Sequence, residues 1–239
     1  MLELKNFSVS ADSKPILENL NLEFGPGFHF VLGPNGAGKS TLAHSILANP
    51  KYTVTGDLIY NNENINDVPT HLRAQEGIFL SFQNPTPIEG LSNFQMIRQM
   101  LQHRIGFKLQ DALHGFRGLA EEFNLPRNWD KEQLNVFASG GEKKKNELIQ
   151  MIMSDPSVVI LDEPDSGLDI DSINLLIDRL KFFTRNNDRC VIIISHYEKL
   201  LRSFTPNSVT IVSDKKATQH FTNDIVDKIF KEGFKQYAS

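Results

Sequence analysis

A glycine-rich run near the N-terminus carries the strongest chemical signal in the sequence. Residues 33–40 match the spacing G-x-x-x-x-G-K-[ST]. Glycines let the backbone bend until successive N–H groups point at phosphate oxygens, and a helix that follows turns its N-terminus toward the same anion. In that arrangement Lys39 reaches the β- and γ-phosphates, and the Ser40 hydroxyl ligates magnesium. The run predicts nucleotide binding by Gly33, Asn35, Gly36, Ala37, Gly38, Lys39, Ser40 and Thr41.

Two acidic residues follow an apolar run in the second half of the chain. Residues 158–161 are apolar, and Asp162 and Glu163 come directly after them. At the carboxyl end of a strand in a parallel sheet, where ligands bind, both acids would face the phosphates. We expect Asp162 to hold magnesium through water, and Glu163 to be the base that polarises the attacking water. Alone, such a pair would fit a solvated loop equally well, but the phosphate loop favours the functional interpretation.

Polar residues follow two further apolar runs in the same way. His196 comes after residues 191–194 and is a candidate sensor of the γ-phosphate, although a lone histidine here is more often a surface-loop residue. Gln83 comes after residues 78–82 and would carry no information without the other motifs. The expected catalytic residues are Lys39, Glu163 and His196, and the expected magnesium-binding residues are Ser40, Gln83 and Asp162.

Alternating strands and helices would position these groups. Residues 2–9 and 16–24 alternate between apolar and polar side chains, as half-buried strands do. The further predicted strands are 28–32, 58–60, 78–82, 158–161, 191–194 and 209–212, and the predicted helices are 41–48 and 173–183. This alternation favours a parallel sheet with helices on both faces. Residues 91–137 have helical spacing instead and predict a mainly helical insertion.

Composition narrows the class of protein. The 239 residues include 25 Lys and Arg and 29 Asp and Glu, a net charge of -4, which argues against a nucleic-acid binder held by bulk charge. The single cysteine, Cys190, can form neither an internal disulfide nor a cysteine-rich metal site, and we expect it in the core. No apolar run approaches the roughly 18 residues of a membrane helix, and the N-terminus lacks a signal-peptide pattern. We therefore predict a cytoplasmic protein and exclude a complete membrane transporter.

The run Ser139-Gly140-Gly141-Glu142 resembles the signature motif of the ATP-binding cassette (ABC) ATPases. The phosphate loop, Gln83, the signature, the two acids, residues 166–169 and His196 also appear in the order of that family, over essentially the whole chain. The resemblance implies a magnesium-dependent ATPase with ATP and Mg²⁺ as cofactors. It implies an α/β P-loop NTPase fold with an N-terminal antiparallel β part. One domain, 1–239, would combine a catalytic core, 1–90 and 138–239, with a helical subdomain, 91–137.

Members of this family work as head-to-tail pairs, and the resemblance extends that expectation to this chain. The signature residues Ser139, Gly140, Gly141 and Glu142 would close on the ATP of the partner subunit, because a helix N-terminus attracts the phosphates. The dimer loop would consist of Ser166, Gly167, Leu168 and Asp169. ATP would hold this transient dimer together and hydrolysis would release it, so that the cycle moves attached partners.

Three stretches resemble a particular branch of the family, the ATPases of the SUF iron–sulfur cluster assembly system. They are residues 77–90, 139–147 and 162–171, with Lys145 and Pro164 as small departures. This similarity implies SufB- and SufD-like scaffold proteins as partners, no nucleic acid and no direct membrane insertion. The partner groove would include residues 85–90 together with part of the insertion around Leu91, Phe94, Ile97 and Met100, although most of these four side chains are expected in the core. The alternative is the nucleotide-binding subunit of an ABC transporter, which shares the same chemistry.

Two details of the resemblance stay open at this stage. Residues 143–145 are three lysines, which would form either a solvated helix face or a switch. In the switch, Lys144 would pair with Asp165 or Glu163 in the free monomer and keep Glu163 away from the water, although an exposed pair contributes only about 0–1 kcal/mol. The family also often stacks adenine on an aromatic residue, and the corresponding residues 10–11 have none.

Overall fold

Two β-sheets organise the protein, whose computed structural model describes residues 1–186, 188–222 and 224–234. The first sheet is antiparallel, in the order β2-β1-β4-β5, and consists of β1 (Leu2–Ala11), β2 (Lys14–Phe24), β4 (Thr53–Tyr60) and β5 (Glu63–Asn64). The second has the order β10-β9-β3-β8-β7-β6 and consists of β3 (Gly27–Leu32), β6 (Ile78–Ser81), β7 (Val158–Asp162), β8 (Cys190–Ile194), β9 (Ser208–Ser213) and β10 (Lys216–His220). Its strands are parallel except for the antiparallel pair β9–β10. The predicted α/β class with an N-terminal antiparallel part is confirmed.

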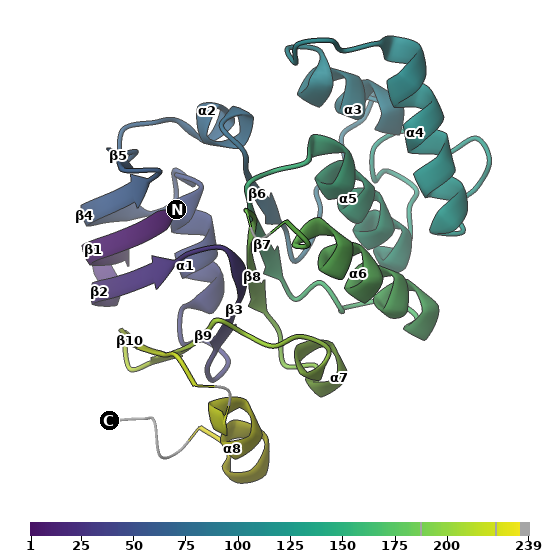
Figure 1. Ribbon diagram of the computed structural model, residues 1–239. Coiled ribbons are helices and arrows are strands. Elements are labelled where there is room, and N and C mark those ends of the chain that lie inside the picture. The colour runs from purple at the N-terminus through teal and green to yellow at the C-terminus, as the bar shows by residue number, and fades with distance from the viewer. Residues whose placement is uncertain (187, 223, 235–239) are drawn as a thin grey trace.

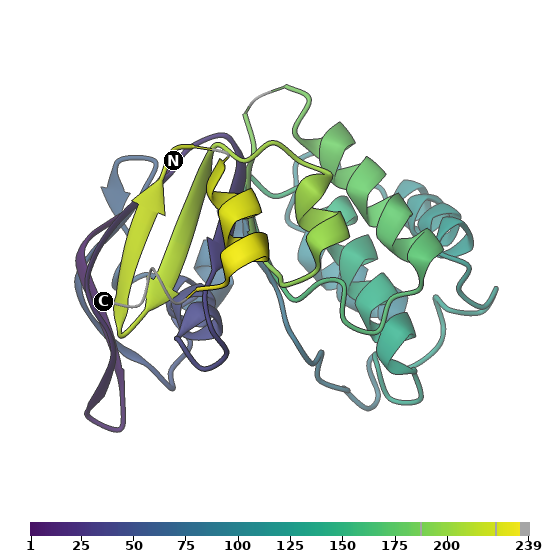
Figure 2. The same cartoon turned by 90° about the horizontal axis from the view of Figure 1, so that it is seen from below.

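Eight helices lie on the two faces of the larger sheet in the described part of the chain. They are α1 (Lys39–Ile46), α2 (Thr70–Gln75), α3 (Asn93–Leu101), α4 (Leu109–Glu122), α5 (Gly140–Ser154), α6 (Ile170–Phe183), α7 (Glu198–Arg202) and α8 (Asp224–Glu232). Figure 1 shows α1 between the two sheets and α3 to α6 on the opposite side of the larger sheet. Figure 2 shows α8 beside the edge formed by β9 and β10. Helix α6 begins three residues before its predicted start, because the Asp169 side chain caps it by accepting from Ser172 N.

The central strands are continuous apolar runs in the sequence, because other elements pack against both faces of their sheet. In β7, Val158 and Ile160 pack with α1 and the antiparallel sheet, whereas Val159 and Leu161 pack with the α5 and α6 side. All five residues of β7 are buried. Burial of each such side chain contributes about 1.5–3 kcal/mol, so these strands form a stiff base for the loops at their carboxyl ends.

The predicted helical insertion contains α3 and α4, which a buried polar network joins to α5. The Asn146 side chain on α5 accepts from Trp129 Nε1 at 3.0 Å and donates to Asn93 Oδ1 at 2.9 Å. Helix α3 begins with a capping box between Ser92 and Gln95. Since α5 lies outside residues 91–137 and still packs on both insertion helices, the domain boundaries stay a prediction.

The position of Cys190 agrees with its sequence interpretation. Its side chain is fully buried in β8, and burial raises the pKa of the thiol to about 12. A thiol so protonated is an inert core group. None of the helices in the described ranges combines the length and the apolar character that crossing a bilayer requires.

Candidate functional site

The carboxyl ends of β3, β6, β7 and β8 meet at one edge of the larger sheet. Strand register places Ser81 beside Leu161 and Asp162 beside Ile194. Just beyond the register, Glu163 N donates to Ile194 O at 2.8 Å. The phosphate loop, Gln83 and His196 each follow one of these strands, while Asp162 is the last residue of β7 and Glu163 comes next. The structure therefore brings together four segments that are far apart in the sequence.

The phosphate loop turns sharply between β3 and α1. Gly33 has φ +152°, and a Cβ there would lie 2.1 Å from Val212 O; Gly38 has φ +105° and precedes the first residue of α1. Both positions therefore require glycine. The buried Lys39 ammonium donates to Gly33 O at 2.8 Å and to Pro34 O at 2.9 Å. Burial lowers the pKa of Lys39, while Glu163 and Asp162 act in the opposite direction, which places this cation close to both acids.

Asp162 and Ser40 could hold a magnesium ion. Both carboxylate oxygens of Asp162 are buried and have no hydrogen-bond partner of good geometry among the described residues. Burial raises the pKa of Asp162, whereas the nearby Ser40 hydroxyl favours the charged form. An uncompensated buried carboxylate is costly, and a cation would relieve that cost. Mg²⁺ binds through one or two protein oxygens, water and phosphate, so these residues fit it. The described ranges hold no cluster of three or more His, Cys, Asp or Glu suited to a metal, so the other ligands would be water and phosphate oxygens.

Glu163, the candidate base, is held by Gln83. The Gln83 Nε2 atom donates to Glu163 Oε2 at 2.6 Å. Glu163 has φ +48°, in the left-handed region that costs a non-glycine residue about 1–3 kcal/mol and that often occurs at functional sites. The turn after Glu163 is closed by a hydrogen bond in which Ser166 N donates to Glu163 O at 3.2 Å. The expected placement of Gln83 at the magnesium ion stays a prediction, because its contact here is with Glu163.

His196 lies in the electrostatic field of the same site. Burial is the largest cause that lowers the pKa of its ring, Lys39 lowers it further, and Glu163 and Asp165 raise it. The lowered pKa favours the neutral ring, which can donate one hydrogen bond and accept another. Its ring also contacts Phe234 edge-on, with the ring centroids 6.3 Å apart. The exposed side chain fits both the γ-phosphate sensor and the surface-loop interpretation, but its electrostatic neighbours favour the sensor.

The predicted pairing of Lys144 with Asp165 is wrong in this structure. Lys144 is buried, donates to Phe82 O and lies 3.5 Å from Glu147 Oε2. Asp165 accepts instead from Ser195 Oγ at 2.6 Å. A fully solvated lysine face is wrong too, because the helical turn of α5 points Lys144 inward. The acid three residues after Lys144 was the sequence signal that could have revealed its partner.

The signature residues and the predicted dimer loop meet within one chain. Ser139 caps α5 in a capping box, and Glu142 Oε2 accepts from Ser139 N and Oγ, each at 2.8 Å, which lowers the pKa of Glu142. A Cβ on Gly141 would lie 2.7 Å from Gly167 O. Lys145, on α5, pairs with Asp169 at 3.1 Å. Ser139, Gly140, Ser166 and Gly167 are exposed, so this face is available to a second subunit.

A pocket of about 420 Å³ lies beside the phosphate loop. Pro15 and Ile16 line it on one side, with Asn35 and Ala37 of the loop opposite. Its wall at residues 15–16 is aliphatic, so a base placed there would pack on aliphatic atoms. The contact with adenine stays a prediction.

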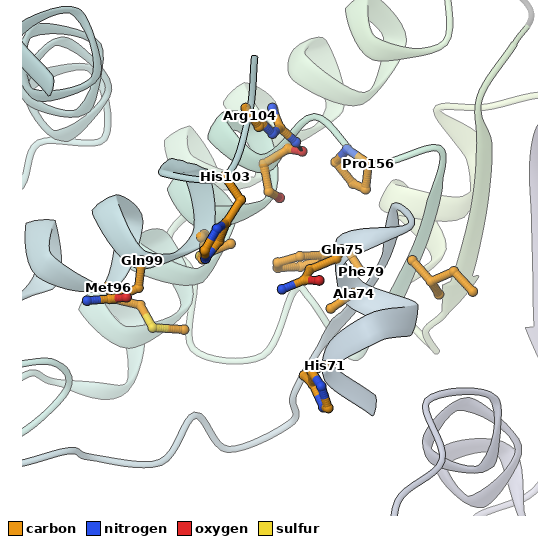
Figure 3. Close-up of a pocket in the computed structure, with 12 residues that line it drawn as sticks. His71, Ala74, Gln75, Phe79, Met96, Gln99, His103, Arg104 and Pro156 are labelled. Atoms are coloured by element: carbon orange, nitrogen blue, oxygen red, sulfur yellow. Dashed lines mark hydrogen bonds between the residues drawn. The ribbon is translucent and has the colours of Figure 1, made fainter. Parts of the chain in front are cut away.

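A second pocket, of about 490 Å³, lies on the far side of β6 between α2, α3 and the end of α5. Figure 3 shows Phe79 and Met96 facing this space, with His71, His103 and Arg104 around it. Residues 85–90, where the sequence placed part of the partner groove, do not line it, whereas Met100 of the insertion does. The lining comes from three separate stretches, 71–79, 96–104 and 154–156. We call this pocket the α2–α3 groove.

Comparisons with known proteins agree with the geometry of the site. Residues 17–166 match the family model described as ABC transporter. The chain is 34% identical over 242 residues to the "Probable ATP-dependent transporter SufC" of Escherichia coli (strain K12), covering 98% of this chain and 97% of that protein. It is also 34% identical over 243 residues to the "Probable ATP-dependent transporter slr0075" of Synechocystis, covering 98% and 94%.

Solved structures share the fold. One described as "Structure of ATP binding subunit of ABC transporter" has a TM-score of 0.80 at 23% identity, covering 98% of this chain and 95% of its own. The dimeric bacterial ABC transporter cassette MJ0796 has a TM-score of 0.78 at 19% identity, covering 92% and 98%.

Proposed function

This chain belongs to the ABC transporter family and is an ATPase of that family, and we propose that it powers iron–sulfur cluster assembly in a cytoplasmic complex. The observation that carries the proposal is its similarity to SufC over 98% of the chain. The resemblance of residues 77–90, 139–147 and 162–171 to the SUF ATPases supports it as well. We assign the cluster itself to the partners, since the single cysteine is buried.

Hydrolysis would take place where the four strand ends meet. Lys39 would bind the β- and γ-phosphates, and Ser40 and Asp162 would hold Mg²⁺, which would neutralise charge that develops on the phosphates. Glu163 would accept the hydrogen bond of the attacking water and polarise it. A neutral His196 would donate to the γ-phosphate. Two features support these roles: the unpartnered carboxylate of Asp162 and the hydrogen bond that orients Glu163.

A second copy of the subunit would complete the site on its open side. The exposed start of α5 offers backbone N–H groups and a helix dipole to the ATP held by the partner. The contact between Gly141 and Gly167 supports this role, because it joins the signature and the dimer loop into one rigid face. Hydrolysis would separate the two copies and thereby move attached scaffold proteins.

The α2–α3 groove is the site where we place scaffold partners similar to SufB and SufD. Its floor is apolar, with Ile78, Phe79 and Met100, and its rim carries Arg104 and two histidines. An amphipathic helix with acidic flanks would fit such a groove. Phe79 lies on β6, three residues before Phe82. A partner bound in the groove would therefore contact the strand that leads into the glutamine loop. The proposal includes neither contact with nucleic acid nor insertion into a membrane.

The second candidate is the nucleotide-binding subunit of an ABC transporter. It is favoured by relatives such as the "Probable ABC transporter ATP-binding protein SpyM3_0208" of Streptococcus pyogenes, 34% identical over 240 residues. Its chemistry would be the same, and the groove would then hold a helix of a membrane protein.

Affinity purification of the full chain from its own cells, with mass spectrometry, tests the two candidates. Co-purification of scaffold proteins without detergent supports cluster assembly, and detergent-dependent capture of an integral membrane protein supports the transporter. Met100→Glu in the groove should abolish capture, whereas Leu109→Glu, on exposed α4, should not. Partner capture that survives Met100→Glu would contradict the assigned groove.

A further inference from the structure

Glu147, a buried acid on α5, has no part in the roles proposed above. Glu147 is almost fully buried, and its Oε1 atom accepts from Phe82 N at 2.6 Å. One helical turn earlier on α5, the buried Lys144 donates to Phe82 O. The two side chains thus bind both main-chain polar groups of the residue directly before Gln83.

The same pair reaches the second strand that ends at the site. Lys144 Nζ lies 3.5 Å from Asp162 O, the carbonyl directly before Glu163. Lys144 and Glu147 therefore contact the main chain just ahead of both residues that form the 2.6 Å hydrogen bond between Gln83 and Glu163. We call Lys144 and Glu147 together the α5 clamp.

The clamp supports a loop that has few other constraints. Strand β6 ends at Ser81, and residues 82–84 are exposed. Without a fixed main chain at Phe82, the Gln83 amide would be free to move away from Glu163. A misplacement of about 1 Å at a reacting group can lower a rate by about 100-fold.

Stability alone does not account for a buried ion pair. Desolvation of the two charges offsets their attraction, and apolar residues of similar volume usually replace such a pair without loss of stability. Burial raises the pKa of the Glu147 carboxyl to about 7, against the influence of Lys144 and of Phe82 N. An acid held at this cost fits a positional role better than a packing role.

We infer that Glu147 is a positioning residue for ATP hydrolysis, which acts by fixing Phe82 so that Gln83 orients Glu163. The inference rests on the proposed role of Glu163. Ser139, which caps α5, is exposed and would face the proposed second subunit, so the clamp would also link closure of the dimer to the orientation of the base. Glu147 itself touches neither the nucleotide nor the water.

Steady-state hydrolysis of Mg-ATP by the full chain, with the melting temperature of every variant, tests the clamp. The double variant Lys144→Met with Glu147→Leu keeps the volume and removes the charges. It should fold with a melting temperature near that of the unchanged protein, lower kcat by about tenfold or more, and leave KM for ATP within about twofold, since only the orientation of the base changes. Glu147→Gln retains an acceptor for Phe82 N and should keep most of kcat.

Asn146→Ala is the matched control, because Asn146 is the buried polar neighbour whose hydrogen bonds go to Trp129 and Asn93 rather than to the glutamine loop. It should lower the melting temperature and leave kcat nearly unchanged. A double variant with the unchanged kcat, or a Glu147→Gln variant as slow as the double variant, overturns the inference. Glu163→Gln in the same assay tests the proposed base separately: if that variant is inactive while the clamp variants are not, only the inference about Glu147 fails.

Discussion

The Gln83 amide and the Glu163 carboxylate, 80 residues apart in the sequence, are joined by a 2.6 Å hydrogen bond across the ends of β6 and β7. The side chain of Glu163 is half-buried, and its backbone has a positive φ that points it out of the line of β7. The bond therefore fixes the carboxylate end of Glu163, while β7 fixes the position of its backbone.

Loss of this bond should slow hydrolysis with little effect on binding. In Gln83→Ala we expect kcat to fall by about tenfold or more and KM for ATP to stay within about twofold, because the phosphate loop is unchanged. Steady-state kinetics measure both values. Asn84→Ala, at the next exposed position, is the control and should behave like the unchanged protein. Equal rates for the two variants would remove Gln83 from the mechanism.

The signature provides a pair of neighbouring glycines with opposite expected effects on stability. A methyl group on Gly141 would lie 2.7 Å from Gly167 O, whereas one on Gly140 would meet nothing within 4 Å. Gly141→Ala should therefore lower the free energy of unfolding by about 1–3 kcal/mol through overpacking. Gly140→Ala should leave it unchanged or raise it by about 0.4–1 kcal/mol, since it restricts the unfolded chain. Denaturant unfolding of the nucleotide-free protein measures the difference, and equal values would show that the two segments do not touch.

The residues of the site were predictable because their motifs lie at strand ends, which the parallel topology brings to one edge. Apolar runs such as Val158–Leu161 showed where those edges lie. The run of three lysines alone did not show that Lys144 is buried, although Glu147, three residues later, was a signal for its partner. The α2–α3 groove was predictable only at Met100, because the rest of its lining comes from segments as far apart as His71 and Pro156.

We expect the Asp162 carboxylate to lower the stability of the nucleotide-free protein and to take part in metal binding. Burial raises the pKa of its carboxyl, so its charged form destabilises the nucleotide-free fold once the pH exceeds the unfolded-state value. At pH 7, Asp162→Asn should therefore raise the melting temperature of the nucleotide-free protein. The same variant should lose the further stabilisation that Mg-ATP gives the unchanged protein. Thermal unfolding with and without Mg-ATP measures both effects. A lower melting temperature without nucleotide, or full stabilisation by Mg-ATP, would contradict this assignment.

Glu147 should give stability a pH dependence of defined sign. Its pKa is about 7 in the folded chain, raised by burial from its ordinary value of 4.5, while Lys144 lowers it and the Asp162 charge raises it. Between these two pH values the folded state retains a proton that the unfolded state has lost, so the free energy of unfolding falls as the pH rises. Glu147→Gln removes this titration. The difference in free energy of unfolding, unchanged protein minus variant, should therefore decrease from pH 5 to pH 7.5 and then level off. Denaturant titrations at several pH values measure it. A difference that stays constant or grows over this range would show that Glu147 is already charged at pH 5, and that Lys144 outweighs the effect of burial.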